Sequence, residues 1–333
     1  MRDHYWRMLA YSPYFDARLS WFPDAWAYKD LYAIYADSGV ASAHPDWVLR
    51  DPSGAPLYIP FDCHGGSCPQ YAADVGNAAF RSQWIAEARA TLARGYRGLF
   101  VDDVNLTLTR VSEGRGTPVV PRDPRTGAPM TETAWRGYMA TFLEQIRTAF
   151  PTIEIGHNAL WSLGHADPAI QRAVQAADWI VIERGVNDDG IRGGSGTFGF
   201  DTLLAHIDWI HQRGKAVVFD ALARSRRDRE YGLAAYFLVG GGNDALGNPK
   251  GGTPDRRWWP AYDGALGAPL GARYVWRGVL RRDFERGIVL VNPPDARTTT
   301  LFLDGAYRNW QGRPRRVLAL RPASGTVLWT VSP

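Results

Sequence analysis

The chain has 333 residues, which is enough for one large catalytic domain with a smaller appendage or for two ordinary domains. Its hydrophobic content of 45% and charged content of 22% are those of a globular protein and exclude a disordered chain. The net charge of +4 comes mainly from arginines spread along the chain. Because they form no basic stripe and no reader motif is present, we expect no nucleic-acid partner.

No apolar segment approaches the about 20 residues that a membrane-spanning helix needs, so we expect no membrane span. The first residues, MRDHYWRMLAYSP, lead from a short polar start into a strand and do not resemble a signal peptide. This predicts a cytoplasmic location, unless a signal peptide was removed, in which case the chain is secreted or belongs to the cell envelope. The sequence does not indicate the oligomeric state.

Short apolar segments alternate with longer amphipathic ones over the first two thirds of the chain, which predicts parallel strands joined by helical crossovers. The expected strands are residues 7–13, 31–36, 71–75, 98–104, 153–158, 178–185, 215–223 and 241–247. The expected helices are residues 76–95, 131–150, 167–177, 200–214 and 228–241. Eight such units in about 250 residues predict an α/β fold, a (β/α)8 TIM-type barrel, over residues 1–268.

The pattern changes in the last part of the chain. Residues 269–333 contain short apolar segments separated by Gly, Pro and Asn, with no helical period. We expect them to form a small antiparallel β domain packed on the barrel.

Polar side chains stand near the ends of several expected strands. In parallel α/β barrels the active site lies at the carboxyl ends of the strands, so these side chains are expected to meet at one rim. They are Asp16, Asp74, Asp102, Asp103, Asn105, His157, Asn158, Glu183 and Asp220.

Two of these residues suit catalysis of glycoside hydrolysis, which needs a carboxylic acid and a second carboxylate. We expect Asp102 to be the nucleophile or the base, and Glu183 to be the general acid/base. Glu183 emerges from a buried strand, which favours a protonated acid, whereas the adjacent Arg184 would oppose protonation. Strand alternation sends Asp102 and Asp103 in different directions, and the sequence leaves open which one faces the pocket.

The remaining polar residues are expected to bind the substrate, a carbohydrate. Asp16, Asp74, Asp103, Asn105, His157, Asn158 and Asp220 would contact sugar hydroxyls. Trp161, Trp258 and Trp259, together with Tyr14, would stack on sugar rings. For each aromatic residue a place in the core is the alternative. No cofactor and no metal are expected.

The two cysteines, Cys63 and Cys68, lie in the segment CHGGSC. The glycines between them allow a tight loop closed by a disulfide. Free thiols are the main alternative, and a metal site the third, since His64 adds only one more ligand.

A long segment, ADVGNAAFRSQWIAEARATLARGYRGLFVDDVN, resembles the pattern D-x-G-N-P…G-[YF]-D-G-[LIV]-[FY]-[LIV]-D-D of bacterial glycoside hydrolases. The chain is similar to the hypothetical glycosyl hydrolase group fifteen and, more loosely, to α-galactosaminidase-type barrels. WVLRDPSGAPLYI and FERGIVLVNPPDARTTTLFLDGAY extend the likeness over most of the chain. The resemblance implies a bacterial polysaccharide-degrading enzyme with Asp102 as nucleophile or base and Glu183 as acid/base. The chain departs from the pattern at Ala78 and Arg97.

Two other functions remain open from the residues. One is a barrel that binds glycans without cleaving them. The other is a metal-dependent hydrolase with Asp102, Asp103, His157 and Asp220 around a hard cation. The sequence does not decide the sugar, the linkage, endo or exo action, or whether the anomeric configuration is retained or inverted.

Overall fold

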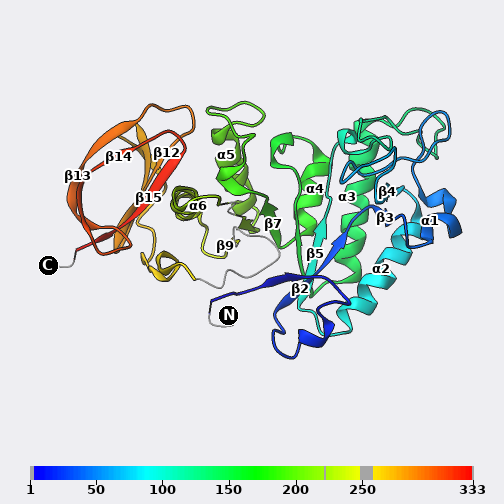
Figure 1. Cartoon of the computed structure of the whole chain (residues 1–333), viewed down its shortest axis with the longest axis horizontal. Helices are drawn as coiled ribbons and strands as arrows, with labels where there is room; N and C mark the ends of the chain where they lie inside the picture. The colour runs from blue at the N-terminus through cyan, green and yellow to red at the C-terminus, as the bar shows by residue number, and fades with distance from the viewer. Residues whose placement is uncertain (1–3, 221–222, 248–257, 332–333) are drawn as a thin grey trace. The chain divides into compact units, whose positions relative to one another are not determined.

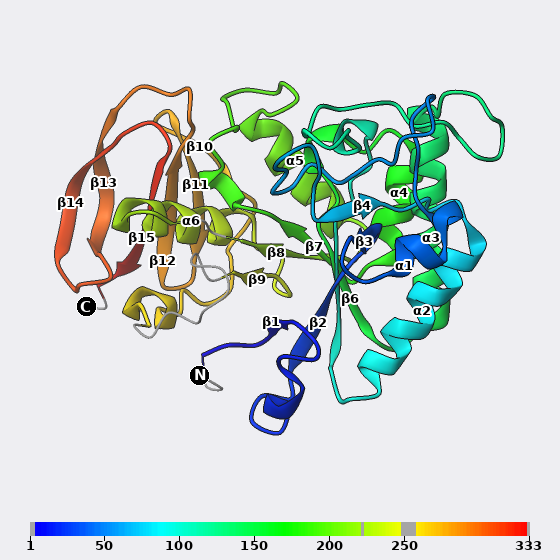
Figure 2. The same cartoon turned by 45° about the vertical axis from the view of Figure 1, so that its right-hand side comes forward.

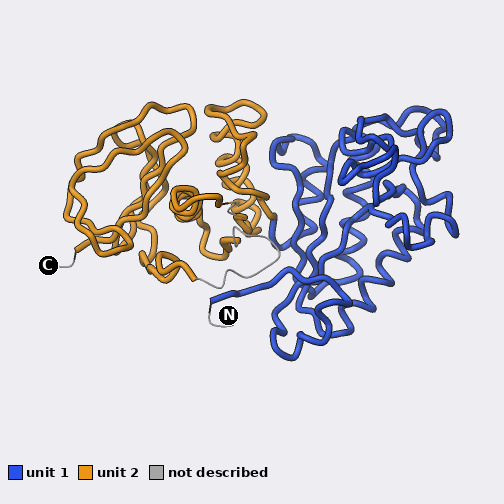
Figure 3. Tube along the Cα trace, in the orientation of Figure 1, with its two compact units in different colours: residues 1–180 blue, residues 181–333 orange. Residues whose placement is uncertain are grey.

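The computed structural model describes residues 4–220, 223–247 and 258–331. The chain divides into two compact units, Met1–Ile180 and Val181–Pro333, and the boundary falls within one strand, β7 (Trp179–Ile182) (Figure 3). Each unit is described by itself below.

Unit 1 is built on parallel strands in the order β1-β2-β5-β6-β7 (Figure 2). Besides β7, these strands are β1 (Met8–Ala10), β2 (Ala25–Asp30), β5 (Gly98–Asp102) and β6 (Glu154–His157). Because all of them run in the same direction, their carboxyl ends lie at one edge of the sheet. This edge carries the candidate site.

Helices cover the parallel strands of unit 1 (Figure 1). Unit 1 contains the short α1 (Val40–Ala43), which packs against residues 33–35, and, over the parallel strands, α2 (Ala78–Leu92), α3 (Glu132–Ala149) and α4 (Pro168–Ala176). The last three confirm the expected helices 76–95, 131–150 and 167–177. Each begins where a side chain accepts hydrogen bonds from the first turn, as at Asn77, Thr131 and Asp167. Short 3₁₀ turns lie at Asp16–Arg18, Pro45–Trp47, Leu108–Arg110 and Trp161–Leu163.

Aromatic side chains pack in successive layers on one face of this sheet, which is called the filled face below. Trp26 is 2% exposed, and its indole donates to Glu154 at 2.8 Å. Its ring needs the space beside Gly98, where an added Cβ would lie 2.7 Å from the indole. One layer further along, Tyr28 lies 5.9 Å from Phe100 between ring centroids. Since side chains alternate along a strand, Asp30 and Asp102 belong to the same face as these aromatic rings.

Two of the expected barrel strands belong to a different sheet. β3 (Ala33–Tyr35) and β4 (Gln70–Ala72) pair antiparallel with each other, as a separate two-stranded sheet. The predictions of parallel strands at residues 31–36 and 71–75 were therefore wrong. The parallel strand that precedes β5 in the sheet is β2, which was not expected.

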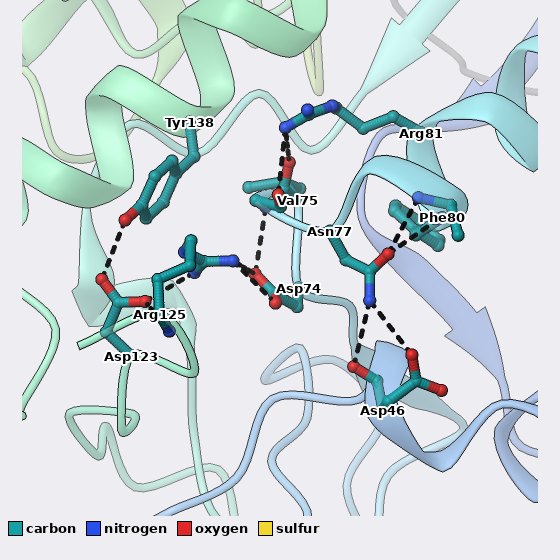
Figure 4. A network of polar contacts seen from close by, with 11 residues as sticks. Asp46, Asp74, Val75, Asn77, Phe80, Arg81, Asp123, Arg125 and Tyr138 are labelled. Atoms are coloured by element: carbon teal, nitrogen blue, oxygen red, sulfur yellow. Dashed lines mark hydrogen bonds and ion pairs between the residues drawn. The ribbon is translucent and has the colours of Figure 1, made fainter. Parts of the chain in front are cut away.

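Asp74, which follows β4, is held in a buried ionic network (Figure 4). It is 2% exposed, and both of its oxygens lie 2.9 Å from Arg125 Nη1. Arg125 also pairs with the buried Asp123 at 2.8 Å, and Tyr138 of α3 donates to Asp123 at 2.9 Å. The network ties the loop before α3 to the chain that enters α2. Close to this loop, Cys63 and Cys68 form the disulfide that the sequence had left as one of three alternatives.

Unit 2 begins with the end of β7 and continues the parallel pattern. It contains the 3₁₀ turn Gly185–Asn187, α5 (Phe200–His211), β8 (Ala216–Phe219), α6 (Arg226–Val239) and β9 (Ala245–Leu246). β8 and β9 pair in parallel, and Asp220 N donates to Ile182 O at 3.1 Å. The described residues thus hold seven parallel strands in the two units together. The closed eight-stranded barrel stays a prediction.

The C-terminal part of unit 2 is an antiparallel sheet in the order β10-β11-β12-β15-β13-β14 (Figure 1). The strands are β10 (Tyr274–Trp276), β11 (Val279–Phe284), β12 (Gly287–Asn292), β13 (Thr299–Arg308), β14 (Pro314–Leu320) and β15 (Ser324–Thr330). β12 is buried at every residue, and α6 packs against it and β15. This sheet confirms the antiparallel β region, while its boundary at residue 269 stays a prediction. No helix in the described part of the chain is long and apolar enough to cross a membrane.

The network around Arg125 generates a stability prediction. Arg125→Met would leave the buried carboxylates of Asp74 and Asp123 without their cation, and we expect a loss of about 3 kcal/mol in the free energy of unfolding. Urea unfolding followed by fluorescence measures it. The control is Arg115→Met, an exposed position in the same loop. Equal unfolding midpoints for the two variants would contradict the structural role of Arg125.

Candidate active site

Two aspartates stand side by side at the carboxyl ends of adjacent strands. Asp30 is the last residue of β2 and Asp102 is the last residue of β5, and the two are paired in the parallel register. They share the face of the sheet that carries Trp26 and Tyr28. Asp102 thus lies on the face of the sheet that carries these rings.

The Tyr28 hydroxyl bridges the two carboxylates. It lies 2.8 Å from Asp30 Oδ1 and is also hydrogen-bonded to Asp102 Oδ2. The hydroxyl of Tyr35 donates to the other oxygen of Asp30 at 2.6 Å. A tyrosine on β2 and a tyrosine on β3 therefore hold the carboxyl of Asp30 between them.

Two further donors fix the second oxygen of Asp102. The Asn158 side-chain amide donates to Asp102 Oδ1, and the backbone N–H of Asp103 donates to the same atom at 2.7 Å. The side-chain oxygen of Asn158 accepts a hydrogen bond from Val104 N at 3.1 Å. Asn158 follows β6, so it connects the ends of β5 and β6 and holds the Asp102 carboxylate in one orientation.

Burial and charge act on the protonation of this group. Asp30 is 6% exposed, and burial raises the pKa of its carboxyl above the ordinary value. Hydrogen bonds from Tyr35 and Tyr28 oppose that rise, whereas the charge of Asp102 adds to it. Burial, followed by the charges of Asp30 and Asp102, also raises the pKa of Tyr28, so this hydroxyl keeps its proton and can donate it.

Asp103 and Asn105 shape the loop that follows β5. Asp103 has φ 57°, in the left-handed region, and so ends the strand. The Asn105 side-chain amide donates to Asp103 Oδ1 and to the Tyr32 hydroxyl, both at 3.0 Å. Of the residues that the sequence predicted, unit 1 therefore brings Asp102, Asp103, Asn105 and Asn158 together.

His157 faces away from this group, toward the helices. It is fully buried at the end of β6, its Nε2 donates to Ala173 O at 2.9 Å, and its Nδ1 accepts from Ala159 N at 3.2 Å. Both ring nitrogens are thus hydrogen-bonded to backbone atoms, one in α4 and one in the loop that precedes it, and a sugar cannot reach them. Among the described residues, no three His, Cys, Asp or Glu side chains are grouped as a metal site.

Asp16 and Asp74 lie elsewhere in unit 1. The Asp16 carboxylate is bound by Arg94 and by the Tyr96 hydroxyl, which precede the start of β5, so Asp16 is at the opposite end of the strands from Asp102. Because β1 and β2 run parallel, the chain must return from the end of β1 to the amino ends of the strands before β2 begins, and Asp16 lies on this return. Both carboxylate oxygens of Asp74 are bound by Arg125. Trp161 begins a 3₁₀ turn after β6 and is half-buried.

In unit 2, Glu183 and Asp220 come directly after β7 and β8. The side chain of Glu183 is exposed, and Arg184 has φ 59°, which turns the chain sharply after it. A Cβ added to Gly185 would lie 2.3 Å from Asp220 O, so the loop after Glu183 packs directly on the backbone after β8.

The paired tryptophans differ in role. Trp259 is 7% exposed and packs edge-on against Trp310, 5.6 Å away between ring centroids, so it belongs to the core of unit 2. Trp258 is half-buried and donates from its indole to Asp263 at 2.8 Å. Only Trp258 of the two presents a surface that a ligand could use.

Sequence reasoning missed Tyr28, Asp30 and Tyr35. The segment AWAYKD alternates aromatic residues with alanine or lysine and ends in aspartate, which is the period of a strand with one filled face. Tyr11 was also missed; it is 55% exposed, and its ring lies 4.5 Å from that of Tyr28.

Comparisons with known proteins agree with this architecture. Residues 9–288 match the hypothetical glycosyl hydrolase family 15, whereas no curated protein matches the sequence. The isomalto-dextranase of Arthrobacter globiformis T6, solved with panose, is 14% identical with a TM-score of 0.50, over 96% of this chain and 60% of that one. This likeness concerns the fold alone.

Two more solved structures are similar over most of the chain. The maltogenic α-amylase AmyB of Thermotoga neapolitana is 13% identical with a TM-score of 0.49, over 93% of this chain and 78% of that one. The glycoside hydrolase domain of PelA from Pseudomonas aeruginosa is 15% identical with a TM-score of 0.45, over 73% of this chain and 94% of that one. On the family match, the chain belongs to the hypothetical glycosyl hydrolase family 15 and is a glycoside hydrolase.

Proposed function

We propose that the enzyme cleaves a glycosidic bond in a poly- or oligosaccharide with two carboxylates. Asp102 is the nucleophile, or the base that activates water, and Glu183 is the general acid/base. In both types of glycosidase one carboxylic acid protonates the leaving oxygen while the second carboxylate acts at the anomeric carbon, directly or through water.

The observation that carries the proposal is the fixed Asp102 carboxylate. It stands at the carboxyl end of a parallel strand, which is where barrel enzymes hold their catalytic groups. The Asn158 amide, the Asp103 N–H and the Tyr28 hydroxyl each bond to it. Donors on both oxygens fix the direction of the carboxylate and thereby reduce the cost of orienting it for reaction.

Glu183 supports the second role by its position along β7. Trp179 packs on Trp26, with ring centroids 5.4 Å apart, on the filled face of the sheet. Glu183 directly follows Ile182, the last residue of β7, so it stands at the carboxyl end of a parallel strand, where barrel enzymes hold their catalytic groups. The side chain of Glu183 is exposed to solvent.

Polar and aromatic residues at and after the strand ends of each unit suit sugar binding. We propose that Asp103, Asn105, Asn158 and Asp220 contact hydroxyl groups, and that Trp161 and Trp258 contribute ring contacts. Tyr11 and Tyr35, which are 55% and 46% exposed, are added to these as stacking surfaces beside Asp30. Sugar rings present flat apolar faces that such phenol rings accept.

Replacing Asp102 tests the catalytic role. A panel of bacterial and plant polysaccharides, assayed by release of reducing ends, first identifies the substrate. We expect Asp102→Asn to lower kcat by about 10³-fold or more, because the catalytic anion is lost. Oligosaccharide binding, measured by calorimetry, should persist.

The matched control is Asp103→Asn, one residue further along and directed to Asn105. Because Asp103 is a proposed sugar contact, this variant should raise KM while kcat stays close to that of the wild type. Equal activity of Asp102→Asn and the wild type would contradict the proposal, and loss of activity in Asp103→Asn alone would transfer the role to Asp103.

Replacing Glu183 tests the acid. Glu183→Gln should lose hydrolysis of the natural oligosaccharide but retain cleavage of an aryl glycoside whose phenol leaves without a proton. Initial rates on both substrates give the ratio. The control is Asp220→Asn, at the end of strand β8, which as a proposed sugar contact should change the rates on both substrates by a similar factor. If Glu183→Gln affects both substrates by the same factor, Glu183 is not the acid.

A further inference from the structure

The Tyr28 hydroxyl has one proton and two carboxyl neighbours. It lies within hydrogen-bond distance of Asp30 Oδ1, at 2.8 Å, and of Asp102 Oδ2. The other oxygen of Asp30 already accepts the Tyr35 proton at 2.6 Å. If both aspartates were ionised, one of the two contacts to Tyr28 would bring two oxygens together with no proton between them.

A single added proton resolves the arrangement. With a proton on Asp30 Oδ1, the chain runs in one direction: Tyr35 donates to Asp30, Asp30 donates to Tyr28, and Tyr28 donates to Asp102. Each oxygen contact then contains one hydrogen. No close pair of buried oxygens is left without a hydrogen bond, which would be costly.

The surroundings decide which aspartate holds the proton. Asp102 faces the amide of Asn158 and the N–H of Asp103, which are donors that suit an anion. In the described part of the chain, the side-chain hydrogen-bond donors to Asp30 are tyrosine hydroxyls, and Asp30 is 6% exposed. The neighbouring Lys29 points to the other face of β2 and pairs with Glu87 at 2.8 Å.

The positive charge of Lys29 lowers the pKa of Asp30, but by less than burial and the charge of Asp102 raise it. Tyr11 lies over the Tyr28 ring, and the Asp102 charge is negative. Trp84 donates from its indole to the backbone oxygen of Asp30 at 2.7 Å and leaves the carboxyl as it is. The direction of the pKa of Asp30, raised by burial and by Asp102, agrees with this proton count.

We propose that Asp30 is a positioning residue held as a neutral carboxylic acid, which directs the Tyr28 proton to Asp102. The inference rests on the proposed role of Asp102. No proton leaves Asp30 during the reaction: when Asp102 bonds to the sugar or takes a proton from water, Asp30 stays neutral. The site therefore holds one negative charge where the strand ends supply two aspartates.

Infrared spectroscopy tests the proton independently of activity. The wild type minus Asp30→Asn difference spectrum at neutral pH should contain the carbonyl band of a protonated carboxyl group, shifted in D₂O. The same band should remain in Asp102→Asn. A difference spectrum with only ionised carboxylate bands would overturn the proposal.

Kinetics test the positioning role. Asp30→Ala removes the donor to Tyr28, and we expect kcat to fall about tenfold, since a hydrogen bond to a charged network is lost. Asp30→Asn restores most of this loss because its neutral amide also donates to Tyr28. If Asp30→Asn is as impaired as Asp30→Ala, the neutral-donor role is refuted.

The two proposals fail in different ways. Full activity of Asp102→Asn refutes the catalytic role of Asp102, whereas the infrared band reports on Asp30 whatever the activity is. An inactive Asp102→Asn together with no infrared change in Asp30→Asn refutes only the role of Asp30.

The pH dependence of stability gives a further prediction. A carboxyl with a raised pKa in the folded state releases its proton first in the unfolded chain, whose Asp pKa is about 3.9. The wild type therefore loses stability relative to Asp30→Asn as the pH rises above about 4, up to the folded pKa. Differential scanning calorimetry should show the melting temperature of Asp30→Asn gaining on that of the wild type over this range. A constant difference would contradict a neutral Asp30.

Discussion

The hydrogen bonds of the Tyr28 hydroxyl to Asp30 and Asp102 are the interaction on which the site depends. The parallel register of β2 and β5 pairs the two aspartates as strand-end neighbours, and two like charges at that distance repel each other. A tyrosine two residues earlier on β2 lies on the same face and places its hydroxyl between them. The arrangement is stable if one of the two carboxyl groups is neutral, and it leaves the other as a single anion fixed in direction.

The layers below this group explain why it is rigid. Trp26 fills the face beside Gly98, and its indole is held by Glu154, which in turn binds Arg7 at 2.6 Å. Phe100 supports the ring of Tyr28. Because the ring of Tyr28 is packed, its hydroxyl cannot move far. The position of Tyr28 on β2 therefore fixes where the hydroxyl lies relative to the two carboxyl groups. Preorganised donors of this kind are an effective way of holding a catalytic charge.

Much of this could be predicted from the sequence, because β5 reads as an apolar segment that ends in aspartate. The expected strand 98–104 contains β5, and alternation correctly separates Asp102 from Asp103. The same alternation, applied to β6, would have excluded His157: residues 154, 156 and 158 share the filled face, while His157 points to α4. The sequence analysis treated His157 and Asn158 alike, although consecutive residues of a strand point to opposite faces. The error lay in overlooking this alternation, and the chemical types of the two residues did not cause it.

Other features depended on partners that a linear pattern does not contain. Asp74 resembles a strand-end ligand until Arg125, about 50 residues later, is seen to neutralise it. Asp16 comes soon after β1 in the sequence, but because β2 runs parallel to β1 the chain must return to the far end of the sheet before β2 begins. β2 itself contains alanine, lysine and aspartate, which are poor strand formers, so β3 appeared to be the better strand although it pairs elsewhere.

The most direct measurement for the central claim is the distance between the carboxyl carbons of Asp102 and Glu183 in a crystal structure with a bound oligosaccharide. The account predicts a separation of about 5–5.5 Å for a retaining enzyme, or about 6.5–9.5 Å for an inverting one, with the scissile oxygen between the two groups. A much larger separation, with Glu183 directed away from the sugar, would contradict it.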